Sequence, residues 1–494
     1  MVRLSSIISI CLLAFILSCK SPSNPYEIYI SPEGGDNNIG SIDEPIASLQ
    51  KAAELARALK KDQMVNIWLA GGVYRITEPL SLGIEDSHIN WQAIPDEKPI
   101  ISGGILLSNW YKEANGSFSA QLDVNAPANI RELFVNGNRA IRARHPNQGY
   151  LNVKRAGEDK RTHFFFNVMD FPKTSRTEQL ELTLLHDWSI SRIAVESIDW
   201  EQNRLTTVDW IGAKALDFFH LTNWEDQPRY FLENAMEFLD VPGEWYYDES
   251  NRKIYYYPAS DESIDNMEFI VPVASQLITI SGNGKSRESV KNITFDGITF
   301  EHVAWQIPKK GYCGIQACMF DNRSSEPNGW NVVPAAIVLD LAADCRFNNC
   351  IIRHVGGSGI WFREETNNCS ITGSHIYDVS GNGVNIGEGQ DRLVEGKPWW
   401  QSSPEQVTEN IEVSNCLIEN CGQQFYGAVG VWAGLVSNTL INRNEIRDLP
   451  YTGVSVGWMW SPEPTPCKEN VISGNHIHHV LNKLSDGGGI YNLG

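Results

Sequence analysis

The sequence predicts an all-β protein built mainly as a right-handed parallel β-helix, a solenoid of short stacked strands. From about residue 290, an apolar pair with members five residues apart recurs along the chain. After most pairs, a Gly opens a further short strand of alternating apolar residues. The first members of neighbouring pairs, Phe347 and Ile371, are 24 residues apart, a length typical of one coil. A single coil cannot bury its apolar face alone, so repeats of this kind predict a stacked solenoid.

The N-terminus predicts export. Arg3 is followed by an apolar run over residues 7–17 that is too short and too early for a membrane span. Residues 1–19 therefore form a predicted signal peptide, and Cys19 after Ile16-Leu17-Ser18 resembles the lipidated Cys of a lipobox. We expect a secreted bacterial lipoprotein of the outer membrane or periplasm, held to the membrane only by this lipid. Ordinary signal cleavage with an incidental Cys is the alternative.

Composition narrows the partners. The chain has 40 Lys and Arg against 60 Asp and Glu, a formal net charge of -20. Such a charge repels nucleic acid and anionic membrane surfaces, so we expect neither as a partner. Eight Cys remain after Cys19, all between Cys313 and Cys467 at repeat positions, where a small apolar side chain would serve as well. A disulfide scaffold would be a short chain stapled throughout.

Residues 20–110 are predicted to form an N-terminal cap and the first coils. A strand starts at Tyr26, a helix with apolar spacing of three and four covers residues 46–59, and a second strand covers residues 65–69. This short helix is expected to cap the open first coil.

Residues 111–265 interrupt the repeat with longer alternating strands and turns rich in Trp and Tyr, as in Gly243-Glu-Trp-Tyr-Tyr. This pattern predicts an inserted antiparallel β module. Residues 266–494 then form the main β-helix.

The register of the repeat can be counted. The position two residues before the second apolar member carries small, apolar or amide side chains, which predicts stacked turn ladders. The apolar pairs are Phe295/Phe300, Phe347/Ile352, Ile371/Ile376, Val413/Ile418, Ile441/Ile446 and Ile472/Ile477. The ladder positions are Ile298, Cys350, Ser374, Cys416, Asn444 and Asn475.

The strands that open with Gly alternate between buried and outward positions. Their outward residues are Trp361, Asn385, Trp432, Ser455 and Tyr491. Aromatic side chains in this row are suited to stacking on sugar rings, or to packing beneath nearby loops.

Two coils carry insertions at the same corner. The second apolar residue lies 7 residues before the next Gly in three coils, but 12 residues before it at Ile418 and Ile477. Loops added to one edge of a solenoid build a site on that edge. The first insertion contains Tyr426, and the second leads into Asp486 followed by three Gly.

Asp486 is the predicted catalytic carboxylate, because it lies on a Gly-rich corner close to His and aromatic residues. A polar column follows the second apolar anchor of each coil, at His354, Asp378, Asn420, Asp448 and His479. Asp448 is the predicted second carboxylate, chosen over Glu388 and Glu445, although a turn ladder also explains the column. The predicted substrate-binding residues are His479, Trp432, Tyr426, Tyr491, Trp458 and Glu388. No metal ligands and no cofactor are predicted.

A separate cluster of positive charge, Arg139, Arg142 and Arg144, stands out in an acidic chain. Guanidinium groups grip carboxylates and sulfates through paired hydrogen bonds. The cluster predicts either recognition of a uronate or sulfate, or ion pairs that fasten the β module to the solenoid.

The sequence resembles glycoside hydrolase family 141, which contains α-L-fucosidases and xylanases that act on plant cell-wall glycans. The likeness rests on the motif starting at Leu133, Gly427-Ala-Val-Gly-Val-Trp, the segment from Asn444, Asn475-His-Ile-His-His-Val and Ser485-Asp-Gly-Gly-Gly. It implies a secreted hydrolase of plant or algal cell-wall polysaccharide that uses two carboxylates, with Asp486 matching the first. The second is expected several tens of residues later, whereas this chain ends at Gly494. We therefore expect a truncated or inactive member, or one completed by another chain.

Two other function classes stay open. A pectate-type polysaccharide lyase would need an acidic Ca²⁺ site and a basic residue, for which Lys483 and Arg363 are available. A non-catalytic glycan-binding surface protein would bind sugar without turning it over.

Overall fold

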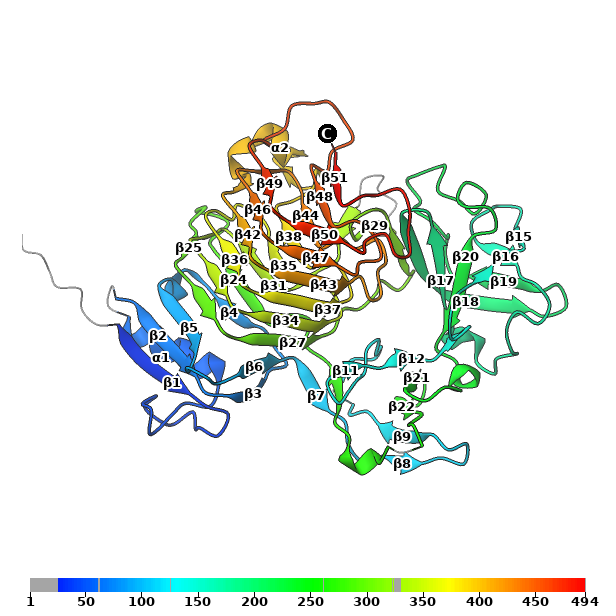
Figure 1. Ribbon diagram of the computed structural model, residues 1–494, viewed down its shortest axis with the longest axis horizontal. Coiled ribbons are helices and arrows are strands. Elements are labelled where there is room, and N and C mark those ends of the chain that lie inside the picture. Colours follow the sequence, from blue (N-terminus) through cyan, green and yellow to red (C-terminus); the bar gives the residue numbers. More distant parts are fainter. Residues whose placement is uncertain are drawn as a thin grey trace, which may run out of the picture.

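The computed structural model describes residues 25–60, 63–124, 126–260, 262–321, 323 and 330–493. The predicted signal peptide and Cys19 lie outside the described residues. Within them the protein is almost entirely β, with two α-helices, α1 (Leu49–Leu59) and α2 (Trp399–Ser402). Figure 1 shows a central stack of strands with the N-terminal segment on one side and an antiparallel module on the other.

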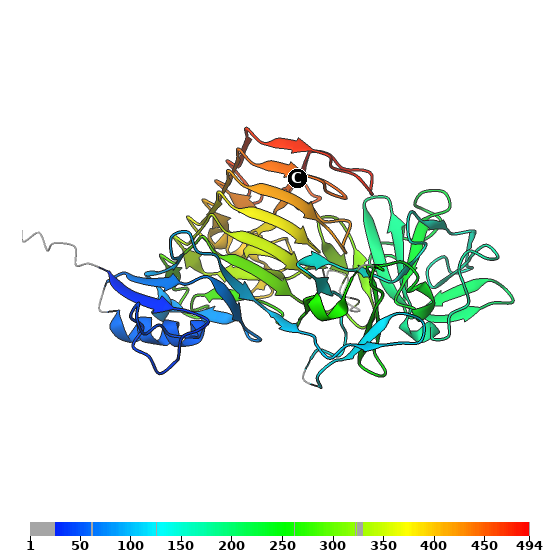
Figure 2. The ribbon, with the colours of Figure 1, turned by 60° about the horizontal axis from the view of Figure 1, so that its bottom comes forward.

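Three parallel sheets form the central stack, and each turn of the chain adds one strand to each (Figure 2). The first sheet contains β1 (Tyr26–Ile30), β2 (Val65–Leu69), β5 (Ile89–Ala93), β26 (Thr294–Asp296), β33 (Arg346–Asn348), β36 (Ser370–Thr372), β42 (Glu412–Ser414), β46 (Leu440–Asn442) and β49 (Val471–Ser473). The second contains β3 (Gly72–Arg75), β6 (Pro99–Ser102), β27 (Thr299–Val303), β34 (Ile351–Val355), β37 (His375–Val379), β43 (Leu417–Cys421), β47 (Glu445–Arg447) and β50 (His476–His478). The third contains β4 (Leu80–Leu82), β24 (Ile278–Ser281), β31 (Ala335–Asp340), β35 (Ser358–Phe362), β38 (Val384–Ile386), β44 (Val431–Ala433), β48 (Val454–Val456) and β51 (Ile490–Asn492).

The predicted apolar pairs line the interior of this stack. Phe295, Phe347 and Ile371 pair in register across the first sheet, and Ile352, Ile376 and Ile418 do so across the second. These side chains are fully buried in one continuous core. The counted register is therefore confirmed, because a period of two puts every second strand residue inside.

The predicted ladder is also present. Cys350 N–H donates to Ser374 Oγ at 3.0 Å, and Cys416 N–H donates to Asn444 Oδ1 at 2.9 Å. Asn444 N–H in turn donates to Asn475 Oδ1 at 2.9 Å. Small or amide side chains are needed here because each one satisfies a backbone group of the neighbouring coil that would otherwise be buried without a partner.

The Gly residues that open the third-sheet strands lie against one another. A Cβ on Gly383 would lie 2.7 Å from the Gly430 carbonyl, and one on Gly453 would lie 2.6 Å from the Gly489 carbonyl. Neighbouring coils approach too closely here for any side chain, which explains why Gly recurs at this position.

The predicted N-terminal helix is confirmed, although it begins at Leu49 rather than Ile46. Ser48 ends the preceding extended segment and its hydroxyl accepts the Lys51 N–H at 3.2 Å, which is an N-cap. Ala52 and Ala56 on its inner face are buried against the first strands of the stack.

The module consists of antiparallel sheets. The first two are formed by β7 (Gly104–Leu106), β8 (Tyr111–Lys112), β9 (Phe118–Gln121), β10 (Phe134–Val135), β11 (Asn138–Arg139), β12 (Ile141–Arg142), β21 (Glu244–Asp248), β22 (Lys253–Tyr256) and β23 (Phe269–Pro272), in which only the contact of β12 with β21 is parallel. The third is formed by β13 (Arg144–His145), β14 (Leu151–Asn152), β15 (Arg155–Ala156), β16 (His163–Phe165), β17 (Glu181–His186), β18 (Ser189–Asp199), β19 (Arg204–Thr207), β20 (Arg229–Glu233), β28 (Tyr312–Gly314), β29 (Met319–Asp321) and β30 (Trp330–Val332). The last three strands come from a loop of the solenoid, so two separate segments of the chain build this sheet.

Short two-stranded pairs complete the fold. They are β25 (Val290–Lys291) with β32 (Ala342–Ala343), β39 (Leu393–Val394) with β40 (Lys397–Pro398), and β41 (Thr408–Glu409) with β45 (Val436–Ser437). Within the described ranges, neither helix has the length and apolar character that a membrane crossing requires.

Candidate functional site

The two five-residue insertions lie on the side of the solenoid that faces the antiparallel module. In the first, the Gln424 carbonyl accepts a hydrogen bond from Arg192 Nε of β18 at 2.9 Å. In the second, Ser485 N–H donates to the Asp187 carbonyl at 2.8 Å. Arg229 of the module also donates to the Lys483 carbonyl at 3.2 Å. The predicted corner is thus the place where solenoid and module meet, as the red loop after β50 in Figure 1 shows.

Asp486 lies on this second insertion with its side chain exposed to solvent. Its backbone is in the left-handed region, at φ 55°, and its carbonyl accepts the Tyr451 hydroxyl at 2.7 Å. A Cβ on the following residue, Gly487, would lie 2.5 Å from Thr452 Oγ1. The Gly run therefore lets the loop lie flat on the solenoid while Asp486 points away from it.

A second carboxylate reaches the same place from the module. Asp187 occupies the two-residue turn between β17 and β18, at φ 42°. Partial burial raises the pKa of Asp187, and the nearby carboxylates of Glu225 and Asp486 raise it further. Sequence reasoning did not identify Asp187, because its closeness to Asp486 depends on how two distant segments pack. The tight hairpin turn was the only local signal.

The predicted aromatic residues form a layer beneath the loop. Tyr426, Trp432 and Trp458 are buried in one apolar cluster that also contains Leu484 of the second insertion. Trp432 is 0% exposed and packs edge-on against Trp361 and Trp458, at ring distances of 6.5 and 6.1 Å. Of the two interpretations of this row, packing beneath the insertions fits Trp432. Tyr491 keeps partial exposure.

Asp448 and His479 lie on neighbouring coils, as the register predicts, since the residues before them, Arg447 and His478, pair directly. Both have left-handed backbones, at φ 55° and 49°, as do His354, Asp378 and Asn420. The polar column is therefore a turn ladder. The Asp448 carboxylate accepts a hydrogen bond from the Arg447 guanidinium at 2.7 Å. A carboxylate held by a guanidinium is stabilised in its charged form, which disfavours proton donation.

Glu388 lies after β38 of the third sheet. Both of its carboxylate oxygens accept from Arg392 Nε at 2.9 Å. Burial raises the pKa of Glu388, although Arg392 opposes the shift. The structure pairs this residue with Arg392 and does not join it to the Asp486 loop through any contact described above.

The arginine cluster fastens the two parts of the molecule together. Arg139 Nε donates to Asp378 Oδ1 at 2.7 Å and so joins the module to β37 of the solenoid. Arg142 lies 3.6 Å from Glu181, and Arg144 donates to the Pro146 and Gly149 carbonyls at 3.0 and 2.9 Å. Of the two interpretations offered above, ion pairing at the interface fits Arg139 and Arg142.

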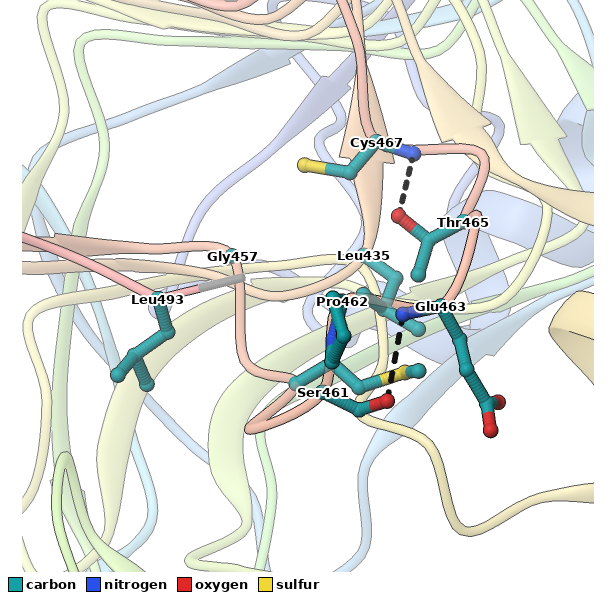
Figure 3. A pocket seen from close by; sticks show the side chains of 9 residues that line it. Leu435, Gly457, Ser461, Pro462, Glu463, Thr465, Cys467 and Leu493 are labelled. Atoms are coloured by element: carbon teal, nitrogen blue, oxygen red, sulfur yellow. Dashed lines mark hydrogen bonds between the residues drawn. The ribbon is translucent and has the colours of Figure 1, made fainter.

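Figure 3 shows a cavity of about 190 Å³ next to the loop after β48. Leu435, Met459 and Leu493 line it, with Glu463 as its one acidic residue. Ligand pockets commonly measure about 300 to 1,000 Å³, so this cavity is small for a sugar chain. The described site for chemistry is the junction at Asp486.

Comparisons with known proteins agree with the expected resemblance. The family model described as the GH141 insertion domain matches residues 120–259. A solved structure titled "Glycoside hydrolase" has 27% sequence identity and a TM-score of 0.84, covering 95% of this chain and 86% of that chain. The chain therefore resembles glycoside hydrolase family 141. No curated protein matches.

Two further solved structures are much more distant. The complex of XylC with xylose has 13% identity and a TM-score of 0.43, covering 91% of this chain and 62% of that one. A rhamnogalacturonan lyase has 10% identity and a TM-score of 0.33, covering 87% and 73%. Likenesses this weak do not bear on the function of this protein.

Proposed function

We propose that this protein is a glycoside hydrolase with a right-handed parallel β-helix, and that it cleaves plant or algal cell-wall polysaccharide with two carboxylates. The observation that carries the proposal is the meeting of Asp486, on the solenoid, with Asp187, on the module. The strong likeness to a structure titled "Glycoside hydrolase" supports the reaction class.

The two carboxylates differ in the way this reaction requires. Asp187 has a raised pKa, because it is partly buried and faces Glu225 and Asp486. It would donate a proton to the glycosidic oxygen as the carbon–oxygen bond breaks. Asp486 is exposed and would act as nucleophile, or as the base that activates water. Water supplies the hydroxyl that completes hydrolysis.

Substrate contacts would surround this pair. Tyr491 and His479 flank the loop that carries Asp486, and Trp188 lies next to Asp187 in the hairpin turn. Trp188 and Tyr491 are partly exposed, as a stacking platform for a sugar ring must be. Tyr426, Trp432 and Trp458 would act from beneath, by holding the loop in place.

The identity of the second carboxylate can be tested by substitution. Reducing-sugar release would be measured on a panel of plant and algal polysaccharides with Asp187→Asn, Asp448→Asn and the control Asp43→Asn, an exposed residue of the N-terminal segment. We expect about a 10²- to 10⁴-fold loss for Asp187→Asn, because general acid catalysis contributes that much. Asp448→Asn and the control should keep most activity. The reverse order of Asp187 and Asp448 would restore Asp448 as the second acid.

A polysaccharide lyase is the second candidate, and Lys483 favours it. The Lys483 ammonium lies 3.9 Å from the centre of the Tyr426 ring, and desolvation of this group lowers the pKa of Lys483 although the side chain as a whole is exposed. A lysine with a lowered pKa can remove a proton. Arg363, the other candidate base, is held by Asp340 at 2.7 Å. Products with the ultraviolet absorbance of an unsaturated uronide would favour the lyase, and reducing sugar without it would favour the hydrolase.

Export and lipidation are part of the same proposal and rest on the N-terminal sequence. We expect Cys19→Ala to move the protein from the membrane fraction to the soluble fraction of the cells that express it. An unchanged distribution would contradict a lipid anchor on Cys19.

A further inference from the structure

A group of imidazoles and carboxylates lies on the outward face of the second parallel sheet. His476 and His478 are two residues apart on β50, so their side chains project from the same face of the strand. Glu445 on β47 pairs directly with His476. Three side chains that commonly bind metals thus come together on two neighbouring strands.

Their spacing suits one metal ion. One donor atom from each of the three side chains lies within 4.8 Å of the other two. His478 Nε2 lies 3.4 Å from Glu445 Oε1, and the rings of His476 and His478 stack at 4.2 Å. Zinc–ligand bonds of about 2.0–2.1 Å in a tetrahedron place neighbouring donors about 3.4 Å apart. His478 and Glu445 already have that separation, so only His476 needs to turn.

The other nitrogen of His478 is held in place. His478 Nδ1 lies 2.6 Å from His479 Nδ1, which leaves Nε2 facing Glu445. Histidines that bind metals usually have such a partner on the second ring nitrogen, because it fixes the ring orientation. Glu445 and His476 are exposed and His478 is partly exposed, so an ion can enter from solvent and keep water as a fourth ligand.

The surrounding charge also favours a cation. The Arg447 guanidinium contacts Glu445 at 3.1 Å, Asp448 at 2.7 Å and Glu419. Three carboxylates therefore surround one guanidinium. When Glu445 turns to a metal ion, Arg447 keeps the other two as partners.

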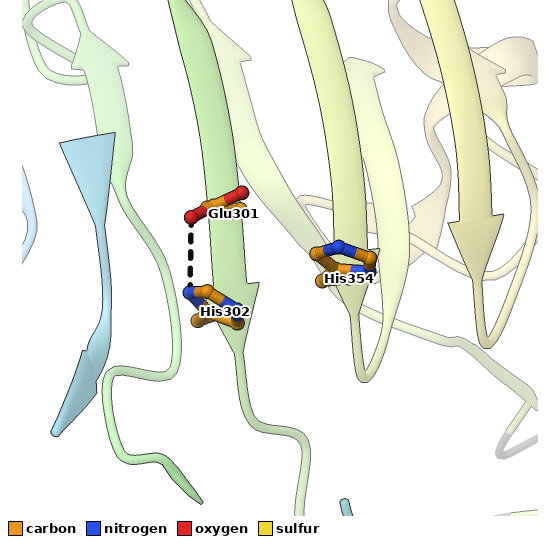
Figure 4. Close-up of side chains that lie close together, drawn as sticks. All are labelled: Glu301, His302 and His354. Carbon is orange, nitrogen blue, oxygen red and sulfur yellow. Dashed lines mark ion pairs between the residues drawn. The ribbon is translucent and has the colours of Figure 1, made fainter. Parts of the chain in front are cut away.

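A buried group of the same composition makes a useful contrast. Figure 4 shows Glu301, His302 and His354 close together inside the protein. His302 Nδ1 is bonded to Ser102 Oγ at 2.9 Å and His354 Nδ1 to Asp378 at 2.6 Å. Burial lowers the pKa of His302 to about 2, and the nearby positive charges add to this.

Access to this buried group is also blocked. The Phe134 ring packs on both imidazoles, at 5.0 and 4.7 Å. Arg353 already holds Glu301, at 2.6 Å. The buried group therefore disfavours an added cation, whereas the exposed one is open and acidic.

We propose that Glu445, His476 and His478 bind a divalent transition metal, with Zn²⁺ as the best match, and that the ion ties β50 to β47. Imidazole ligands suit Zn²⁺, Cu²⁺ and Ni²⁺, whereas Ca²⁺ and Mg²⁺ require oxygen ligands. The site is independent of the proposed hydrolase activity.

Calorimetric titration of Zn²⁺ into the metal-free full chain, produced without a histidine tag, tests the proposal. We expect one tight equivalent in the unsubstituted protein, and binding weakened at least about 10-fold in His478→Asn and in Glu445→Gln. The matched control is His375→Asn, which removes an imidazole from the same face that bonds Glu419 at 2.9 Å. This control should bind as the unsubstituted protein does.

A thermal melt guards against loss of folding. Zn²⁺ should raise the melting temperature of the unsubstituted protein and of His375→Asn, but not that of His478→Asn or Glu445→Gln. Equal Zn²⁺ affinity in His478→Asn and the unsubstituted protein would overturn the proposal. So would a preference for Ca²⁺, or an equal loss of binding in His375→Asn.

Discussion

The solenoid interior and its junction with the module are both buried, but they are held together by different forces. The solenoid core consists of stacked apolar residues such as Ile352, Ile376 and Ile418, none of which is exposed. The junction is charged. Glu181 accepts from Arg131 at 2.6 Å and from Arg192 at 2.5 Å, and Arg192 also pairs with Glu233 at 2.5 Å.

This difference predicts different responses to substitution. An apolar core loses stability in proportion to the volume removed, and an apolar residue of similar size can replace another. A buried ion pair fails as a unit, because the partner left behind keeps an uncompensated charge. The solenoid should therefore respond gradually to change and the junction abruptly.

The largest effect is expected at Glu181. Glu181→Gln leaves Arg131 and Arg192 without their shared carboxylate, which should lower the free energy of unfolding by about 3–5 kcal/mol. Urea unfolding followed by tryptophan fluorescence would measure it. The control is Glu196→Gln, an exposed residue on β18 of the same sheet, which should change little. Equal effects of the two substitutions would contradict the role given to the junction.

The same pairs make the junction sensitive to acid. Burial alone would raise the pKa of Glu181, but Arg131, Arg142 and Arg192 together hold it well below the usual value. The stability that Glu181 contributes is therefore fully present above its unfolded pKa of about 4.3, and is lost as the pH falls through its lower folded pKa. Urea midpoints measured at decreasing pH should fall more steeply for the unsubstituted protein than for Glu181→Gln. Parallel curves would count against this account.

A smaller effect is expected in the turn ladder. Asn444→Ala removes the acceptor of the Cys416 N–H and the donor to the Val413 carbonyl, both at 2.9 Å. Leaving these buried groups unpaired should cost about 1–3 kcal/mol. The exposed Ser473→Ala on the next coil is the control, and the urea midpoint is the readout. If Asn444→Ala unfolds at the midpoint of the control, the ladder contributes no stability.

The smallest effect is expected in the apolar core. Ile376→Val removes one methylene from a fully buried side chain and should cost about 0.5–1.5 kcal/mol. The same urea measurement applies. A loss as large as that of Glu181→Gln would show that the core is no more tolerant than the junction.

The regular part of the fold could be predicted from the sequence because it depends on local periodicity. The apolar pairs, the Asn444 ladder and the Gly-opened strands repeat at fixed spacing, and each coil predicts the next. The helix was also predicted, apart from its first residue, which the Ser48 cap determines.

The site could be predicted only in part. The equal insertions indicated the corner and Asp486, since both deviate from a counted period. Asp187 could not be found, because its position next to Asp486 depends on the packing of a module some 300 residues earlier in the chain. The burial of Trp432 has the same origin, since loops from other coils and the module cover it.

The central claim, a sugar-cleaving site at the junction, is tested most directly by Asp486→Asn. Reducing-sugar release from the best polysaccharide of the panel would be compared for the unsubstituted protein and this variant, at matched melting temperature. The account predicts a loss of at least about 100-fold, because a carboxylate that acts in the transition state contributes that much or more. Turnover by Asp486→Asn at the rate of the unsubstituted protein would contradict it.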